Sequence, residues 1–118
     1  MINFKKNLKS LKFAIEGLFT MLREENNARF HLLATVCVVG LGIYMNLSKT
    51  DWLWISLAIA IVWILEAINT ALEALVNLAS PEIHPLAKKA KDVAAAAVLF
   101  GAIWAVVVGV IVFWGYIV

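Results

Sequence analysis

Three long runs of apolar residues, separated by short polar breaks, fill most of the chain. The runs cover residues 30–47, 52–78 and 93–118, and each is long enough to cross a bilayer as a helix. The break NLSKTD is typical of a tight turn, whereas SPEIHPLAKKAKD contains two prolines and predicts a longer link, residues 80–92, with its own helical turn. The pattern therefore predicts three transmembrane helices.

Residues 4–25 follow a different pattern, in which apolar side chains recur at intervals of three and four and most charged side chains lie between them. This pattern predicts an amphipathic helix that lies on the membrane surface, with its lysines facing anionic headgroups. A helix that packs on a soluble partner is the alternative. The apolar positions are Phe4, Leu8, Leu11, Ile15, Leu18, Phe19 and Leu22.

Composition places the chain in a membrane, because 64% of its residues are hydrophobic, only 15% are charged and the mean hydropathy is +0.91. We expect an all-α integral membrane protein whose 118 residues form a single domain, 1–118. A chain with three spans is too small to surround a large substrate. We therefore expect a homo-oligomer in which a neighbouring copy completes any active site.

The distribution of basic residues predicts the orientation of the spans. They gather before the first and third runs, whereas Lys49 alone lies between the first and second. Because positively charged loops stay in the cytoplasm, we expect the N-terminus and residues 80–92 on the cytoplasmic side and the C-terminus outside. Interfacial aromatic residues at the predicted exterior ends agree with this orientation; they are Tyr44, Trp52, Trp54, Trp114 and Tyr116.

The second run contains two glutamates and an asparagine, Glu66, Asn69 and Glu73, on one face of the predicted helix. A carboxylate at bilayer depth costs about 3 kcal/mol, so this spacing favours chemistry over packing. Glu66 lies 14 positions after Trp52, about 21 Å below the outer edge, and Glu73 lies about 10 Å further in, at the cytoplasmic interface. The alternative is that Glu66 and Asn69 only hydrogen-bond a neighbouring helix.

Further charged residues are predicted at this cytoplasmic depth. Glu24 and Glu25 precede the first span, and Lys91 and Asp92 precede the third. Carboxylates bind a divalent cation, and a lysine together with that cation binds a polyphosphate, which are the requirements of phosphoryl transfer. The deeper Glu66 would accept a proton from a hydroxyl at the membrane boundary. A purely topogenic role is the alternative for the basic run before the third span.

A proton- or cation-coupled transporter subunit is a second hypothesis, because buried carboxylates also serve as relay groups. It requires polar residues that continue to the outer leaflet. Only Ser56 occurs between Trp52 and Leu65, and no polar side chain occurs between Trp104 and Tyr116. The sequence therefore favours an enzyme over a transporter, and a transporter over a scaffold without activity.

Four motifs carry a resemblance to a known family. They are LKFAIEGL in the predicted surface helix, LREENNARFHLLA before the first span, the pattern E-x-x-N-x-x-x-E in EAINTALE, and HPLAKKAKDVAAAAVL. They are similar to the prokaryotic diacylglycerol kinases, which are small trimeric membrane lipid kinases. The resemblance implies a homotrimer in a bacterial inner (cytoplasmic) membrane that transfers the γ-phosphate of ATP, with Mg²⁺, to a lipid alcohol. Nucleic acid is not an expected partner.

The resemblance also implies roles for individual residues. Glu66 matches the catalytic base that takes the proton of the lipid hydroxyl, and Asn69 stands beside it. Glu25 and Glu73 match carboxylates that bind Mg²⁺, and Lys91 matches the lysine on the transferred phosphate. In the family these groups come from different subunits, so each site would be shared.

Further matches concern the nucleotide. Asp92 accompanies the lysine at the phosphates, Glu82 and His84 would lie near the adenosine, and Lys6 and Phe13 on the surface helix would be weaker contacts. For His84, which lies between two prolines, a role in the turn is the alternative.

Two lipid alcohols fit this resemblance. Asn77 and Ala95 replace an acidic residue and a serine of the Gram-negative diacylglycerol kinases, whereas SPEIHPLAK and DVAAAAV are more similar to the Gram-positive branch that phosphorylates undecaprenol. Both alcohols present a primary hydroxyl, so the carboxylate chemistry does not separate them. We expect a lipid kinase, with undecaprenol favoured over diacylglycerol.

Overall fold

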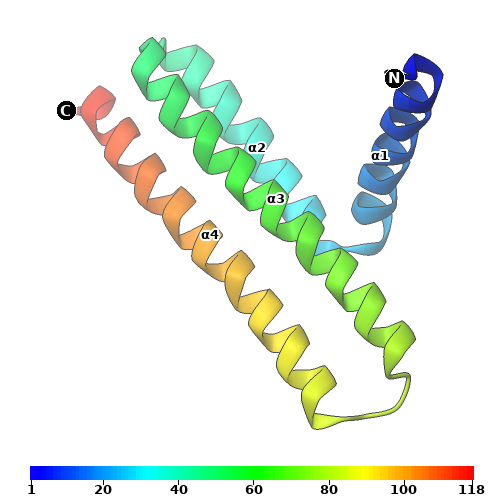
Figure 1. Ribbon diagram of the computed structural model, residues 1–118. Helices are drawn as coiled ribbons and strands as arrows, with labels where there is room; N and C mark the ends of the chain where they lie inside the picture. The colour runs from blue at the N-terminus through cyan, green and yellow to red at the C-terminus, as the bar shows by residue number, and fades with distance from the viewer.

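The computed structural model describes all 118 residues and consists of four α-helices without a β-strand. The helices are α1 (Phe4–Glu24), α2 (Asn26–Met45), α3 (Lys49–Ala79) and α4 (Pro85–Ile117). Figure 1 shows α2, α3 and α4 running alongside one another, while α1 diverges from them. The predicted all-helical fold class with three apolar helices is confirmed.

The three apolar helices differ in length. Helix α2 has 20 residues, α3 has 31 and α4 has 33, which at 1.5 Å per residue correspond to about 30, 46 and 50 Å. The hydrocarbon core of a bilayer is about 30 Å thick, so α2 matches it while α3 and α4 are longer. Because a short turn joins α2 to α3, the excess lies at the end where α3 leads into α4 (Figure 1).

Helix α2 is displaced from the predicted first span. It begins at Asn26, four residues earlier than the predicted start, and ends at Met45. Asn46 stops the helix because it adopts the left-handed conformation, with φ of 55°, that asparagine tolerates better than most residues. Leu47 consequently lies outside the helix and turns inward, where it is 7% exposed.

Helix α4 begins at Pro85, so the predicted link over residues 80–92 is too long, and its basic residues lie in the first turns of α4 instead. Proline suits the first position of a helix because the N–H that it lacks has no partner there. The side chain of His84 caps the helix, since its Nδ1 accepts a hydrogen bond from the backbone N–H of Leu86 at 3.1 Å. The second proline therefore starts a helix rather than interrupting one.

Helices α3 and α4 pack against each other in antiparallel directions. Gly101 permits a close approach, because a Cβ at this position would lie 2.7 Å from Cδ1 of Leu65. A cluster of five buried apolar residues forms the core near the α2–α3 turn, and the transporter hypothesis finds no support. Its members are Leu47, Ile55, Ala58, Val108 and Val112.

Polar groups at the end of the molecule near the α2–α3 turn satisfy one another. The hydroxyl of Tyr116 donates a hydrogen bond to Oδ2 of Asp51 at 2.7 Å and accepts one from the backbone N–H of Ser48 at 2.8 Å. Ser48 also caps α3, because its Oγ accepts from the backbone N–H of Asp51 at 3.1 Å. These bonds tie the C-terminal turn of α4 to the start of α3.

Helix α1 contacts the rest of the chain through its C-terminal end. Met21 is buried there, whereas the residues before Thr20 are exposed. The guanidinium of Arg29 fixes the link between α1 and α2, because it donates hydrogen bonds to the carbonyl oxygens of Leu22 at 2.9 Å and Arg23 at 2.7 Å. The first half of α1 therefore extends away from the other helices.

Candidate active site

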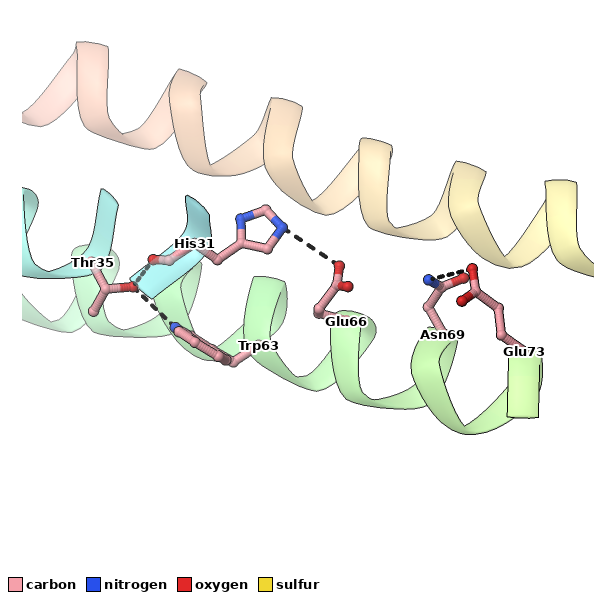
Figure 2. A network of polar contacts seen from close by, with 6 residues as sticks. All are labelled: His31, Thr35, Trp63, Glu66, Asn69 and Glu73. Atoms are coloured by element: carbon pink, nitrogen blue, oxygen red, sulfur yellow. Dashed lines mark hydrogen bonds and ion pairs between the residues drawn. The ribbon is translucent and has the colours of Figure 1, made fainter. Parts of the chain in front are cut away.

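Glu66 of α3 is the most deeply buried charged residue, with 0% of its surface exposed. Neither carboxylate oxygen has a hydrogen-bond partner within the chain. The nearest group that can carry a positive charge comes from α2, where Nε2 of His31 lies 3.5 Å from Oε2 of Glu66 (Figure 2). Burial of a carboxylate without a hydrogen bond carries a large desolvation penalty, so Glu66 is unusual for a residue that only packs.

A second contact between α2 and α3 lies one turn away. Nε1 of Trp63 donates a hydrogen bond to Oγ1 of Thr35 at 3.0 Å, and the Thr35 hydroxyl donates to the backbone carbonyl of His31 at 2.7 Å. Figure 2 shows this chain of contacts leading from Trp63 to the imidazole that faces Glu66. The two contacts together fix the position of α2 along α3.

Asn69 and Glu73 continue the polar face of α3 towards its C-terminal end. Asn69 is 5% exposed, and its Nδ2 donates a hydrogen bond to Oε1 of Glu73 at 3.4 Å. Oδ1 of Asn69 and Oγ1 of Thr70 have no partner within the chain. The face predicted from the spacing therefore exists, and most of its oxygen atoms remain free.

The position of α2 also places Glu25. Thr35 is level with Trp63 and His31 with Glu66, so the same antiparallel alignment puts Glu25 level with Glu73. The pKa of the Glu25 carboxyl is raised above its usual value of 4.5, first by burial and then by the negative charges of Glu73, Glu66 and Glu24. Acidic groups thus crowd together here, as the sequence predicted for Glu25 and Glu73.

The carboxylates of Glu25 and Glu73 are the candidate ligands for a metal ion. No three His, Cys, Asp or Glu side chains in the chain come close enough to bind an ion by themselves. Two carboxylates at one level nevertheless form a donor set that suits Mg²⁺, which is commonly held by one or two carboxylates together with substrate phosphates and water.

A polar cavity of about 310 Å³ lies between the end of α3 and the start of α4. Among the predicted nucleotide contacts, it brings together Glu82, His84 and Lys91. Asp92 instead pairs with Lys88, with 2.6 Å between Oδ2 and Nζ. Lys88 also lines the cavity and was not predicted as a site residue, although its i, i+4 spacing to Asp92 is a local signal once both are known to be helical.

Two predicted nucleotide contacts lie away from this cluster. Lys6 and Phe13 are exposed on α1, and Lys6 precedes the buried Met21 by 15 residues, or about 22 Å of helix. A groove of about 590 Å³ separates α1 from α3, and Glu24 and Thr70 are among its lining residues. A single chain therefore does not bring Lys6 or Phe13 to the carboxylates.

His31 is the site residue that the sequence prediction missed. A signal was present, because titratable residues inside apolar spans, histidine included, are rare and commonly functional. The contact also depends on the alignment of α2 with α3, which brings His31 to Glu66 and is not visible in the sequence.

Comparisons with known proteins indicate the family of the chain. The family model described as prokaryotic diacylglycerol kinase matches residues 12–113. The chain is 39% identical over 105 residues to the undecaprenol kinase of Bacillus subtilis (strain 168), which covers 89% of this chain and 85% of that relative. It is 37% identical over 108 residues to the diacylglycerol kinase of Helicobacter pylori (strain J99), and the match covers 90% of this chain and 84% of that relative. The diacylglycerol kinase of Escherichia coli (strain K12) is 27% identical over 113 residues, and the match covers 96% of this chain and 93% of that relative. Because the family model spans most of the chain, the protein belongs to the prokaryotic diacylglycerol kinase family of membrane lipid kinases.

Proposed function

We propose that the chain is an ATP- and Mg²⁺-dependent kinase that transfers the γ-phosphate of ATP to the primary hydroxyl of a lipid alcohol. The observation that carries this proposal is the Glu66 carboxylate, which is fully buried without a hydrogen-bond partner. Abstraction of a proton from a hydroxyl at the membrane boundary accounts for a carboxylate held in this state. Asn69, one turn away with a free Oδ1, would help to orient the same hydroxyl.

The proposed reaction needs one proton acceptor and one source of positive charge. Glu66 takes the hydroxyl proton as the hydroxyl oxygen bonds to the transferred phosphorus, while the bond from that phosphorus to the leaving oxygen of the nucleotide breaks. Lys91 offsets negative charge on the transferred group. Burial of Glu66 excludes water, which would otherwise compete with the lipid as phosphate acceptor.

Glu25 and Glu73 would hold the Mg²⁺ ion. Their alignment at one level and the crowding of negative charge that raises the pKa of Glu25 both support a cation at this point. When bound, the ion would neutralise charge on the nucleotide phosphates.

The nucleotide would lie at the cavity between α3 and α4, with Glu82 and His84 towards the adenosine and Lys91 with Asp92 towards the phosphates. The exposure of Lys6 and Phe13, far from the carboxylates of their own chain, supports a homotrimer in which another copy supplies them. Each active site would then be shared between subunits.

The membrane arrangement follows from the same site. We place α2, α3 and α4 across a bacterial inner membrane, with the N-terminus and residues 80–92 in the cytoplasm, where ATP is available, and the C-terminus outside. Helix α1 would lie as an amphipathic helix on the cytoplasmic surface, because its exposed face carries Phe4, Leu8 and Leu11 beside lysines.

Undecaprenol is the favoured substrate, with diacylglycerol next. This preference rests on the Gram-positive character of the sequence around the α3–α4 link and on similarity to the undecaprenol kinase of Bacillus subtilis. The test is phosphate transfer from ATP by the purified protein in lipid or detergent, with undecaprenol and diacylglycerol supplied separately. We expect product that disappears when Mg²⁺ is chelated, and faster turnover of undecaprenol.

The outcomes of this assay separate the parts of the proposal. Faster turnover of diacylglycerol would overturn the substrate preference and leave the kinase assignment standing. Absence of product with both lipids, from protein that is folded and oligomeric, would overturn the kinase assignment for this chain.

A further inference from the structure

The proposed reaction assigns no role to His31. We infer that His31 is a positioning residue, whose protonated imidazole keeps the Glu66 carboxylate ionised and oriented for proton abstraction. The inference rests on the proposed kinase function and adds a residue to the same site.

The distribution of charge around Glu66 supports this role. Negative charge gathers in this part of the molecule, because the carboxylates of Glu73, Glu66 and Glu24 all act on Glu25. On α2, the guanidinium of Arg29 is engaged by the carbonyl oxygens of Leu22 and Arg23. On α4, Gly101 packs at the level of Glu66, and the nearest ionisable residues are nine or more positions away, about 13 Å along the axis. Within the chain, His31 is the one basic side chain that lies within 4.0 Å of the Glu66 carboxylate.

The imidazole is also held in a defined place. The hydrogen bonds from Trp63 to Thr35 and from Thr35 to the carbonyl of His31 fix the backbone from which the ring projects. The His31 side chain is only 13% exposed, so water screens its interaction with Glu66 weakly. A charge held this close in a poorly hydrated site acts strongly on the protonation of its partner.

His31 also lines an apolar cavity of about 150 Å³ between α2, α3 and α4. Thr35 is the other polar residue there, and the rest of the wall includes Val38, Ile59 and Ala105. A hydrocarbon chain bound in this cavity would contact the imidazole at the polar end of the cavity. The ring therefore connects a lipid-like environment with the proposed base.

The reaction step remains balanced with His31 in this role. The hydroxyl proton passes to the Glu66 carboxylate as the oxygen–phosphorus bond forms and the bond to the leaving nucleotide oxygen breaks. The imidazolium keeps its own proton throughout and stabilises the ionised form of Glu66 before transfer. Loss of the imidazolium should thus hinder the reaction most at low pH, where Glu66 is more easily protonated.

The test compares the kcat of wild type, His31→Leu and His31→Gln between about pH 5.5 and 9. We expect the acidic limb of the profile to move by about one pH unit to higher pH in both variants. For His31→Leu this means a loss in kcat of about tenfold near pH 6.5 that shrinks to under about threefold near pH 8.5. The KM for ATP should stay within about twofold.

Leu33→Ala is the matched control, because Leu33 lies on α2 two positions away with its side chain exposed. Its pH profile should coincide with that of wild type. A merely structural role for His31 would lower kcat by the same factor at every pH. That result, or an unchanged kcat in His31→Leu, overturns the inference.

A stability measurement tests the pair without relying on activity. We would measure the Tm of His31→Leu, Glu66→Gln and the double variant in one detergent. If the residues form an ion pair, His31→Leu lowers Tm clearly in the wild-type background and much less beside Glu66→Gln. Additive shifts overturn the inference. Absence of lipid phosphorylation by wild-type protein would instead refute the proposed function, and the Tm cycle would still decide whether the pair exists.

Discussion

Replacement of Glu66 by glutamine should abolish phosphate transfer while leaving the fold intact. Glutamine keeps the shape of the side chain but removes the proton acceptor. General-base catalysis contributes about 10²- to 10⁴-fold to a reaction, so the barrier should rise by about 3 to 5 kcal/mol. Glu66 is 0% exposed within the chain, so we expect a loss towards the upper end of this range.

The effect of the same change on stability should be small. An ionised carboxylate at this depth costs about 3 kcal/mol, a cost that His31 at 3.5 Å partly offsets. Glutamine removes the carboxylate and its cost together, and the imidazole left behind can release its proton, so no unpaired charge remains buried. The free energy of unfolding should change by less than about 1 kcal/mol.

The assay is turnover with saturating lipid and ATP, combined with thermal unfolding in the same detergent. Glu16→Gln is the matched control, since this substitution makes the same chemical change at an exposed position of α1. The control should retain wild-type turnover. Turnover of Glu66→Gln within tenfold of wild type would refute Glu66 as the base, and a large loss of stability would show that the carboxylate is structural.

Three further changes test other parts of the structure. Gly101→Val should lower the free energy of unfolding by about 1 to 3 kcal/mol, because its side chain has no space against α3; Gly109→Val, where nothing lies within 4 Å, should cost clearly less. Tyr116→Phe removes the hydrogen bond to Asp51 and should lower stability by about 1 kcal/mol, with turnover unchanged because this contact lies at the opposite end from the site. Glu25→Gln should raise the Mg²⁺ concentration needed for half-maximal turnover by at least about tenfold, while chelation of Mg²⁺ should lower the Tm of wild type more than that of the variant.

The helices could be predicted because their signals are local. Run length and hydropathy indicate each span, and the spacing of polar residues predicts the shared face of Glu66, Asn69 and Glu73 without knowledge of the other helices. The start of α4 was misplaced because the effect of Pro85 depends on the residue before it. A proline whose neighbour His84 caps the helix marks a beginning, whereas the sequence alone predicted a longer link with its own helical turn.

The site required information that no single segment contains. The pairing of His31 with Glu66 depends on how α2 is aligned along α3. The hydrogen bond from Trp63 to Thr35 fixes this alignment. Convergence of Glu25 with Glu73 was predicted from depth, since both lie near the same membrane boundary. Depth is a coarse coordinate that resolves which groups share a level, but it does not determine which side chains face each other.

The polar groups at the two ends of α3 differ in whether they have hydrogen-bond partners. Near the α2–α3 turn, Ser48, Asp51 and Tyr116 bond to one another, so their polar atoms contribute to stability. At the other end, the Glu66 carboxylate and Oδ1 of Asn69 are buried without hydrogen-bond partners, although each unsatisfied group costs about 1 to 3 kcal/mol or more. A chain that satisfies its polar groups at one end has the means to do so at the other. Under the proposed function, these groups would bind atoms that the isolated chain does not supply, namely those of the substrate, the cation and neighbouring copies.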